Sequence, residues 1–456
     1  MIRRMATNPI PQFPAFPAFP AFPAFPAFPA FPDGFLWGVS TSAHQIEGAA
    51  DAREPSVWDT FSAEPGKVKD GSTAAVACDH YHRYREDVAL LAGLGVDAYR
   101  FSISWPRVRA AGGLDFYDRL VDELCAAGIR PVPTLFHWDL PVSLDWLERD
   151  TASHFAEYVS LVADRLGDRV RKWITINEPA EHTLFGHALG AHAPGKQLMF
   201  DALPAAHHQL LAHGLAVRAL RASGATDIGI ANSHGPTWPA SQDPADLEAA
   251  AFYDLLLNRL FADPVLLGEY PEGLGELMPG DVAADLKVIG EPLDWYGVNY
   301  YAPTRVGAPQ GEDIEFGGLT IPAELPFSVR EIEDVPLTDF GWPVVPEALT
   351  ELLTDFRDRY GDRLPPIVIT ENGCSYDGID DQPRITYLDG HIRALHRAVE
   401  AGVDVRGYFV WSLLDNFEWA EGYARRFGLV HVDYETLTRT PKASYTWFQN
   451  TLRSQH

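Results

Sequence analysis

The sequence has 456 residues, with 36 Lys and Arg against 63 Asp and Glu and a formal net charge of −27. A chain of this length buries a large core, and its acidity argues against a nucleic-acid partner, which requires a basic surface. The three cysteines, Cys78, Cys125 and Cys374, lack metal-type spacing, exclude a disulfide scaffold and favour a reducing compartment, so we expect a cytoplasmic protein.

The N-terminal segment 1–30 is of low complexity, because Phe-Pro-Ala repeats from position 13 to position 32. Proline at every third position removes backbone donors and blocks the helix that a membrane span requires, so we predict no membrane association. We predict a disordered tail over 1–30 and one continuous domain over 31–456. A tail that docks on a partner through a stripe of Phe side chains in polyproline II is the alternative.

Short apolar runs alternate with longer segments of helical period along the rest of the chain. The runs cover residues 35–39, 98–103, 130–136, 172–176, 228–232, 293–299, 366–370 and 405–411. Strands that alternate with helices indicate a parallel sheet, and eight such units predict a single (β/α)₈ TIM barrel with elaborated loops after its strands. A doubly wound open sheet is the competing fold, although no Gly-x-Gly-x-x-Gly follows an early strand.

Polar and aromatic side chains stand where several predicted strands end, which is unusual for the end of an apolar run. Asn177 and Glu178 follow the fourth run, and Glu371 follows the seventh. Further candidates at such ends are Arg100, His137, Trp138, Asn299, Tyr301, Trp411, Glu418 and Trp419. Because the active site of a (β/α)₈ barrel lies at the carboxyl ends of its strands, these side chains are expected to meet there.

Two glutamates at two strand ends are the pair that cleavage of a glycosidic bond requires. One carboxyl must stay protonated to donate to the leaving oxygen, and the other must stay ionised to attack the anomeric carbon. Different surroundings can separate the two pKa values and so assign the two roles. A single glutamate at a strand end is more often a structural ion-pair partner, whereas two of them among Trp, His, Asn and Arg favour catalysis.

Six ordered segments resemble the signatures of glycoside hydrolase family one, the β-glucosidase family. Residues 175–179 (TINEP) and 369–373 (ITENG) resemble its two catalytic signatures, and residues 35–48 (FLWGVSTSAHQIEG) resemble its N-terminal signature. Residues 99–107 (YRFSISWPR), 136–141 (FHWDLP) and 411–419 (WSLLDNFEW) match further family segments. The resemblance extends over roughly residues 31–448 and implies a retaining, exo-acting β-glucosidase without metal or cofactor.

The resemblance also implies a role for each matching residue. Glu371 is expected to be the nucleophile and Glu178 the acid and base, with Arg100, Tyr301 and Asn299 as catalytic support. Asn177 matches the residue that binds the sugar 2-hydroxyl, and Trp411 matches the platform under the ring. The other expected substrate-binding residues are Gln45, His137, Trp138, Glu418 and Trp419 for the glucose unit, Trp342 on the leaving-group side, and Phe427.

Glu418 and Glu421 argue against 6-phosphosugars, because two carboxylates repel a phosphate dianion. Glu178 argues against thioglucosidases, which carry Gln there, and glucose is only weakly preferred over galactose or fucose. The loops at 108–113 and 141–146 are shorter than is usual in the family, which either opens the leaving-group side or leaves the site poorly shaped. The expected ligand is a small β-glucoside or oligosaccharide, whereas a homo-oligomer and a non-catalytic sugar-binding barrel stay open.

Overall fold

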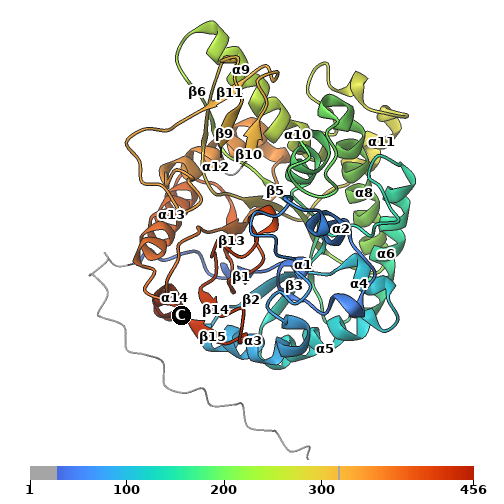
Figure 1. Ribbon diagram of the computed structural model, residues 1–456, viewed down its shortest axis with the longest axis vertical. Coiled ribbons are helices and arrows are strands. Elements are labelled where there is room, and N and C mark those ends of the chain that lie inside the picture. Colours follow the sequence, from blue (N-terminus) through green and yellow to red (C-terminus); the bar gives the residue numbers. More distant parts are fainter. Residues whose placement is uncertain (1–27, 317–318, 456) are drawn as a thin grey trace, which may run out of the picture.

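The computed structural model describes residues 28–316 and 319–455, and its centre is a closed barrel of parallel strands (Figure 1). The strands follow the order β1-β13-β12-β7-β5-β4-β3-β2. Closure is visible at β1, where Leu36 pairs with Gly407 of β13 and Gly38 pairs with Ala98 of β2. Their bounds are β1 Leu36–Ser40, β2 Ala98–Ser102, β3 Arg130–Phe136, β4 Lys172–Asn177, β5 Asp227–Ser233, β7 Tyr296–Asn299, β12 Ile367–Asn372 and β13 Val405–Trp411. The predicted (β/α)₈ barrel is confirmed, and the open sheet is wrong.

The largest difference between a predicted run and its strand is at β7, which begins at Tyr296 instead of residue 293. Asp294 makes two hydrogen bonds to Ile228 of β5. Its backbone N–H donates to the Ile228 carbonyl at 3.0 Å, and its side-chain carboxylate accepts from the Ile228 N–H at 2.7 Å. A side-chain oxygen thus takes the place of a backbone acceptor, so the regular strand starts later.

Long helices surround the barrel, as the ribbon in Figure 1 shows. They are α3 His80–Leu94, α5 Gly113–Ala126, α6 Asp150–Leu166, α8 Leu203–Ala222, α11 Val282–Ile289, α12 Glu347–Tyr360, α13 Gln382–Glu400 and α14 Ala443–Arg453. Gly128 and Gly402 follow α5 and α13 with φ of 76° and 90°, the left-handed conformation that ends a helix at low cost for glycine.

The segments between these strands and helices carry further elements that the periodicity of the sequence did not predict. The helical ones are α1 Ala43–Ile46, η1 Ala50–Ala52, α2 Val57–Ala63, α4 Trp105–Arg109, α7 Pro179–Glu181, η2 His182–Ala188, η3 Met199–Ala202, α9 Pro244–Asp254, η4 Leu255–Arg259, α10 Leu260–Leu266, η5 Gly275–Leu277, η6 Gly361–Arg363 and η7 Trp419–Glu421. The additional strands are β6 Thr237–Pro239, β8 Thr304–Gly307, β9 Ile314–Phe316, β10 Leu319–Ile321, β11 Ser328–Arg330, β14 Val430–Val432 and β15 Arg439–Pro441.

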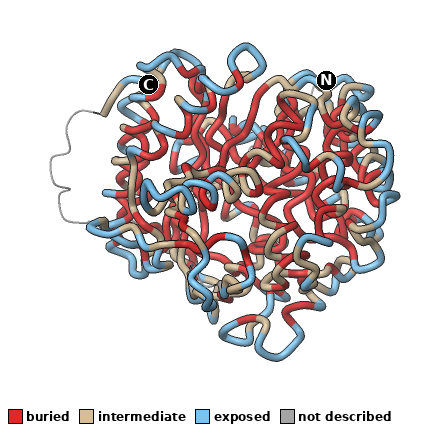
Figure 2. The backbone as a smooth tube through the Cα atoms, turned by 90° about the horizontal axis from the view of Figure 1, so that it is seen from above, coloured by how far each residue is buried: buried red, intermediate tan, exposed pale blue. Residues whose placement is uncertain are grey.

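Two apolar regions support the barrel, and buried backbone fills the middle of the molecule in Figure 2. The larger cluster packs the helices against the outside of the strands. A separate cluster takes one side chain from each barrel strand or its start: Leu36, Ala98, Val132, Ile174, Ala231, Trp295, Val368 and Phe409. The barrel interior is the space that all these strands share, so this cluster fills the interior on the side away from the carboxyl ends. The carboxyl ends remain available for polar residues.

Residues 1–27, and with them most of the predicted tail, lie outside the described residues, so the tail and the division at residue 30 stay predictions. Phe28 and Phe31 contact the Trp37 ring, with centroids 6.3 and 5.0 Å away. The last repeat units therefore pack on the barrel. No helix in the described part of the chain has the length and apolar character needed to cross a membrane.

Candidate active site

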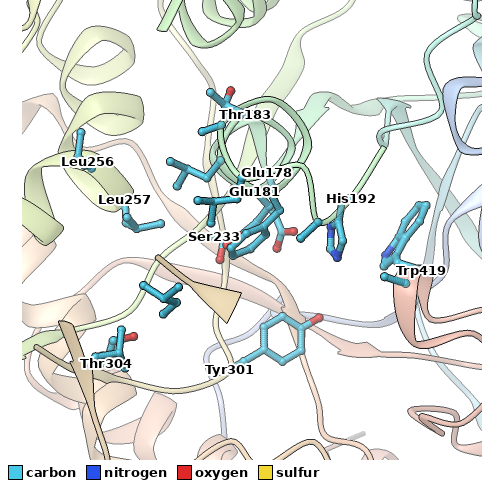
Figure 3. A pocket seen from close by; sticks show the side chains of 18 of the residues that line it. Glu178, Glu181, Thr183, His192, Ser233, Leu256, Leu257, Tyr301, Thr304 and Trp419 are labelled. Atoms are coloured by element: carbon cyan, nitrogen blue, oxygen red, sulfur yellow. The ribbon is translucent and has the colours of Figure 1, made fainter. Parts of the chain in front are cut away.

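A cavity of about 500 Å³ opens at the carboxyl ends of the barrel strands. Glu178 and Glu371 both line it, and each is almost completely buried, with exposed fractions of 5% and 3%. Figure 3 shows Glu178 between Trp419 on one side and Leu256 and Leu257 on the other. The two predicted catalytic glutamates therefore share one cavity that has two different ends.

Glu371 lies on β12 with both carboxylate oxygens engaged. The Arg100 guanidinium on β2 donates from Nη1 to Oε1 at 2.6 Å, and the Tyr301 hydroxyl donates to Oε2 at 2.6 Å. Burial raises the pKa of Glu371, but Arg100 and Tyr301 both oppose this rise by stabilising the ionised form. Both predicted partners of Glu371 are thus in direct contact with it.

Glu178 lies directly after β4, and its surroundings favour the protonated form more strongly. Burial raises the pKa of Glu178 well above its usual value, and the negative charges of Glu371 and Glu181 raise it further. The side chain of Asn299 donates to Oε1 at 2.7 Å and is the nearest polar anchor. Because Glu371 has a cation and a phenol hydroxyl on its carboxylate whereas Glu178 has a neutral amide, Glu371 loses its proton first and Glu178 retains one.

Asn177 joins the two glutamates through a network of buried polar groups. Its Oδ1 accepts from Arg100 Nη2 at 2.5 Å and from Asn299 Nδ2 at 3.0 Å. Its Nδ2 lies 3.1 Å from His137 Nε2. Burial and the nearby Arg100 hold the pKa of His137 well below its usual value, so the ring is neutral. The other ring nitrogen, Nδ1, is buried without a partner in the described structure, which is consistent with a role in binding a ligand.

Glu418 lines the cavity on the side of Trp419, and Gln45 bonds to it. Gln45 Nε2 lies 3.3 Å from Glu418 Oε2 and also donates to the Phe417 carbonyl at 3.0 Å. Burial, followed by the charges of Glu371 and Glu421, raises the pKa of Glu418 to about 8. At neutral pH Glu418 therefore holds a proton and can both donate and accept a hydrogen bond.

Aromatic rings complete both parts of the cavity. Trp411 and Trp419 stack with His137, with ring centroids 5.8 and 5.9 Å apart. Trp138, which also lines the cavity, donates from Nε1 to the Asn177 carbonyl at 3.0 Å. On the opposite rim, rings of the following residues are in contact: Tyr301, Phe340, Trp342 and Phe427. All predicted site residues except Gln45, Arg100, Asn177 and Asn299 line the cavity directly, and these four bond to residues that do.

Three site residues have left-handed backbone conformations that are rare for residues with a side chain. Trp138, Glu178 and Trp419 have φ of 73°, 44° and 51°. Each such residue costs of order 1 kcal/mol or more and persists only where the surroundings impose it. The surroundings of the cavity therefore hold these three residues in a strained conformation.

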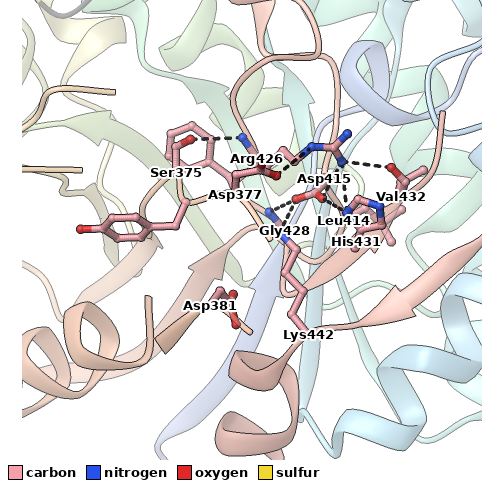
Figure 4. Close-up of polar contacts among 12 residues, drawn as sticks. Ser375, Asp377, Asp381, Leu414, Asp415, Arg426, Gly428, His431, Val432 and Lys442 are labelled. Atoms are coloured by element: carbon pink, nitrogen blue, oxygen red, sulfur yellow. Dashed lines mark hydrogen bonds and ion pairs between the residues drawn. The ribbon is translucent and has the colours of Figure 1, made fainter. Parts of the chain in front are cut away.

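The loop after β13, which carries Glu418, Trp419 and Phe427, is anchored by the buried carboxylate of Asp415 (Figure 4). Lys442 Nζ donates to Oδ1 at 2.7 Å, and Arg426 Nη1 donates to Oδ2 at 3.0 Å. Burial alone would raise the pKa of Asp415, but Lys442, His431 and Arg384 together outweigh it and lower the pKa. This ion-pair cluster holds the start of the loop in place.

One premise of the sequence analysis is wrong. Glu421 does not act as a free carboxylate against phosphate, because Lys69 pairs with it at 2.5 Å and Arg425 at 3.1 Å, and Glu418 is protonated at neutral pH. The loops at 108–113 and 141–146 contribute no described residue to the lining of the cavity, so their effect on the leaving-group side stays a prediction.

Sequence reasoning also missed several lining residues. Glu181 stands three positions after Glu178 at the end of a short helical turn, so its place directly after a catalytic signature was an available signal. Phe340, two positions before Trp342, was an aromatic neighbour of a predicted residue. The apolar lining from η2, η4 and β11 had no such signal, because those loop elements carry no motif.

The comparisons with known proteins agree with this geometry. The model of Glycosyl hydrolase family 1 matches residues 28–456. The chain is 43% identical to Beta-glucosidase A of Thermotoga maritima over 92% of this chain and 97% of the relative, and 45% identical to the Beta-glucosidase of Agrobacterium sp. over 91% and 93%. Its fold matches the solved structure of the Thermotoga maritima β-glucosidase in complex with glucoimidazole, with a TM-score of 0.87 and 42% identity over 93% and 99% of the two chains. It also matches the psychrophilic β-glucosidase BglU of Micrococcus antarcticus, with a TM-score of 0.88 and 45% identity over 94% and 98%.

Proposed function

The chain belongs to glycosyl hydrolase family 1 and is a retaining β-glucosidase, and we propose that Glu371 is its nucleophile and Glu178 its acid and base. The observation that carries this assignment is the asymmetry of the two carboxyls. Arg100 and Tyr301 bond to Glu371 and favour its ionised form, whereas Glu178 has burial and two acidic neighbours that favour its protonated form. An ionised nucleophile beside a protonated acid is the state that begins the reaction.

In the first step Glu371 attacks the anomeric carbon while Glu178 gives its proton to the glycosidic oxygen, and the leaving alcohol departs. The carboxylate charge of Glu371 is consumed in the ester bond to the sugar. That charge is one of the causes that raise the pKa of Glu178, so the pKa of Glu178 falls once the ester forms. Glu178 is then ionised and can act as a base.

In the second step Glu178 accepts a proton from water as the water attacks the anomeric carbon, and the bond to Glu371 breaks. Two displacements at the same carbon restore the original configuration, so β-glucose is released first. Arg100 and Tyr301 stabilise the negative charge that returns to the Glu371 carboxylate through their hydrogen bonds to it. The same two hydrogen bonds therefore stabilise ionised Glu371 before the first step and after the second.

For the glucose unit we propose binding at the end of the cavity that contains Glu418 and Trp419. Asn177 shares Arg100 with Glu371 and Asn299 with Glu178, and we assign it to the 2-hydroxyl, whose contact is expected to strengthen in the transition state. Trp411 is the platform under the ring. The other proposed contacts to the hydroxyls are Gln45, His137, Trp138, Glu418 and Trp419, with Trp342 and Phe427 on the leaving-group side. Asn299 holds Glu178 in position.

Cellular location is a further proposal. All three cysteines are free thiols, with Cys78 and Cys374 buried and Cys125 exposed, which fits a reducing compartment such as the cytoplasm. The preference for glucose over its epimers is also proposed, and one relative, 41% identical, is named a bifunctional β-D-glucosidase and β-D-fucosidase. Substrates with unphosphorylated sugars are favoured by the names of the relatives.

A panel of 4-nitrophenyl sugars tests the proposal, with the β-glucoside, β-galactoside, β-fucoside and β-glucoside 6-phosphate offered to the purified protein. We expect hydrolysis of the β-glucoside, with proton NMR showing β-glucose before its mutarotation to the α anomer. Release of the α anomer first would contradict the double displacement. Turnover of the phosphorylated sugar alone would contradict the assignment of Glu418, and no turnover by the folded protein would favour the sugar-binding alternative.

A further inference from the structure

The part of the cavity beyond Glu178 is lined mainly by hydrocarbon. Its walls, which we call the leaving-group chamber, are formed by Leu184, Met199, Leu256, Leu257, Leu325 and Phe327. Leu256, Leu325 and Phe327 belong to an apolar cluster that is separate from the barrel core. Figure 3 shows Leu256 and Leu257 on the far side of Glu178 from Trp419, and thus from the end proposed to hold glucose. A leaving group that departs from Glu178 must lie in this chamber.

The polar side chains of the chamber mostly have partners within the protein. Thr183 Oγ1 accepts from Gln209 at 2.9 Å, and the Tyr253 hydroxyl bonds to Thr304. A sugar as leaving group would bring several hydroxyls next to hydrocarbon walls, where they would lose their hydrogen bonds to water without replacement. A predominantly apolar leaving group has no such penalty and removes apolar surface from water on both sides.

Glu181 is the exception among these polar groups. It lines the cavity next to Glu178 and Ser233, and its Oε2 is buried without a hydrogen-bond partner in the described structure. Burial raises the pKa of Glu181 to about 7, which Ser233 only partly opposes by hydrogen bonding. A buried acceptor without a donor is unfavourable, so this carboxyl is suited to a donor that arrives with the substrate.

From these observations we propose that the enzyme acts on β-glucosides whose leaving group is apolar over most of its length and carries a hydroxyl or N–H close to the glycosidic oxygen, and that Glu181 accepts a hydrogen bond from this donor. The proposal rests on the proposed β-glucosidase function and narrows its substrate class. Glu181 is then a residue that determines specificity for the leaving group, while Glu178 performs the proton transfer.

The apolar part is tested with octyl and methyl β-glucoside. Their alcohols are similar in basicity, so the ratio of their kcat/KM values reports binding in the leaving-group chamber rather than leaving-group chemistry. We expect octyl to exceed methyl by at least about tenfold, because several methylene groups leave water. In Leu257→Asn this ratio should fall several-fold. Leu161→Asn is the matched control, because Leu161 on α6 is 52% exposed and does not line the cavity.

The polar part is tested with 2-hydroxyethyl and propyl β-glucoside, which have equal numbers of heavy atoms and differ by one hydroxyl in place of a methyl group. The ratio of their kcat/KM values should fall by about tenfold in Glu181→Leu, as expected for a lost hydrogen bond to a carboxylate. Glu181→Gln keeps an acceptor oxygen and should retain most of the ratio. Comparing ratios between variants cancels the inductive effect of the hydroxyl. If Glu181→Leu does not fold, Glu181→Ala serves in its place.

The outcomes separate the two proposals. An octyl-to-methyl ratio near one, or a hydroxyethyl-to-propyl ratio that Glu181→Leu leaves unchanged, would overturn this inference while hydrolysis of 4-nitrophenyl β-glucoside still supported the proposed function. If the octyl-to-methyl ratio of kcat/KM fell as much in Leu161→Asn as in Leu257→Asn, the assignment of the leaving-group chamber as the binding place of the octyl chain would be overturned. Loss of all turnover in the folded wild-type protein would overturn the proposed function and this inference with it.

Discussion

Replacing Glu178 by Ala should affect substrates in proportion to their need for a proton. A general acid contributes about 10²–10⁴-fold, which corresponds to about 3–5 kcal/mol of transition-state stabilisation. We expect Glu178 to make the full contribution of a general acid, because its side chain is 5% exposed and is held by a hydrogen bond from Asn299 at 2.7 Å. We therefore expect kcat/KM for methyl β-glucoside to fall by that factor. For 2,4-dinitrophenyl β-glucoside, which leaves as a stable phenolate, the fall should be less than about tenfold.

Azide provides a stereochemical readout of the same variant. Glu178→Ala opens space on the β face of the anomeric carbon, so azide should attack the glycosyl-enzyme there and yield β-glucosyl azide. In Glu371→Ala the space opens on the α face, so azide should displace an activated leaving group directly and yield α-glucosyl azide. Product anomers are assigned by proton NMR. Equal losses of kcat/KM on both substrates, or exchanged azide products, would refute the assignment of the two glutamates.

Three other variants have defined outcomes. Glu181→Gln removes a negative charge that raises the pKa of Glu178, so the basic limb of the kcat/KM pH profile should move to lower pH. Tyr301→Phe removes a hydrogen bond that lowers the pKa of Glu371, so the acidic limb should move to higher pH. Asp415→Asn leaves buried cations without their counter-ion and should reduce the free energy of unfolding by about 3–5 kcal/mol, measured by urea denaturation.

Each variant has a result that would count against the reasoning. A basic limb that stays in place or moves upward in Glu181→Gln would show that Glu181 carries no charge near Glu178. An unchanged acidic limb in Tyr301→Phe would remove Tyr301 as a partner of the ionised nucleophile. A loss below about 1 kcal/mol in Asp415→Asn would show that the ion-pair cluster does not stabilise the loop after β13.

The barrel and the two glutamates could be predicted because their signals are local. A buried parallel strand is a short apolar run, and a polar residue at its end stands out, as Glu178 and Glu371 do. Helix ends were equally readable, since Gly128 and Gly402 both take the left-handed conformation expected after a helix. These features depend on residues that are close in the sequence, so they can be recognised without a structure.

The leaving-group side could not be predicted in the same way. Its walls combine side chains from η2, η3, η4 and the segment before β11, which are far apart in the sequence and carry no periodic pattern. The charge state of Glu418 could not be predicted either, because its pKa of about 8 comes first from burial and then from the charges of Glu371 and Glu421. The pairing of Glu421 with Lys69 joins residues more than 300 positions apart, so the repulsion expected from the sequence alone was an incorrect premise.

The anchoring of the loop after β13 by Lys442 has a consequence for biosynthesis. The barrel closes only when β13 pairs with β1, and the glucose end of the cavity is held only when Lys442 reaches Asp415. Such distant pairing is slow to form and must await nearly the whole chain. A polypeptide still on the ribosome should therefore remain inactive until Lys442 has left the exit tunnel, so that hydrolysis begins only after translation is almost complete.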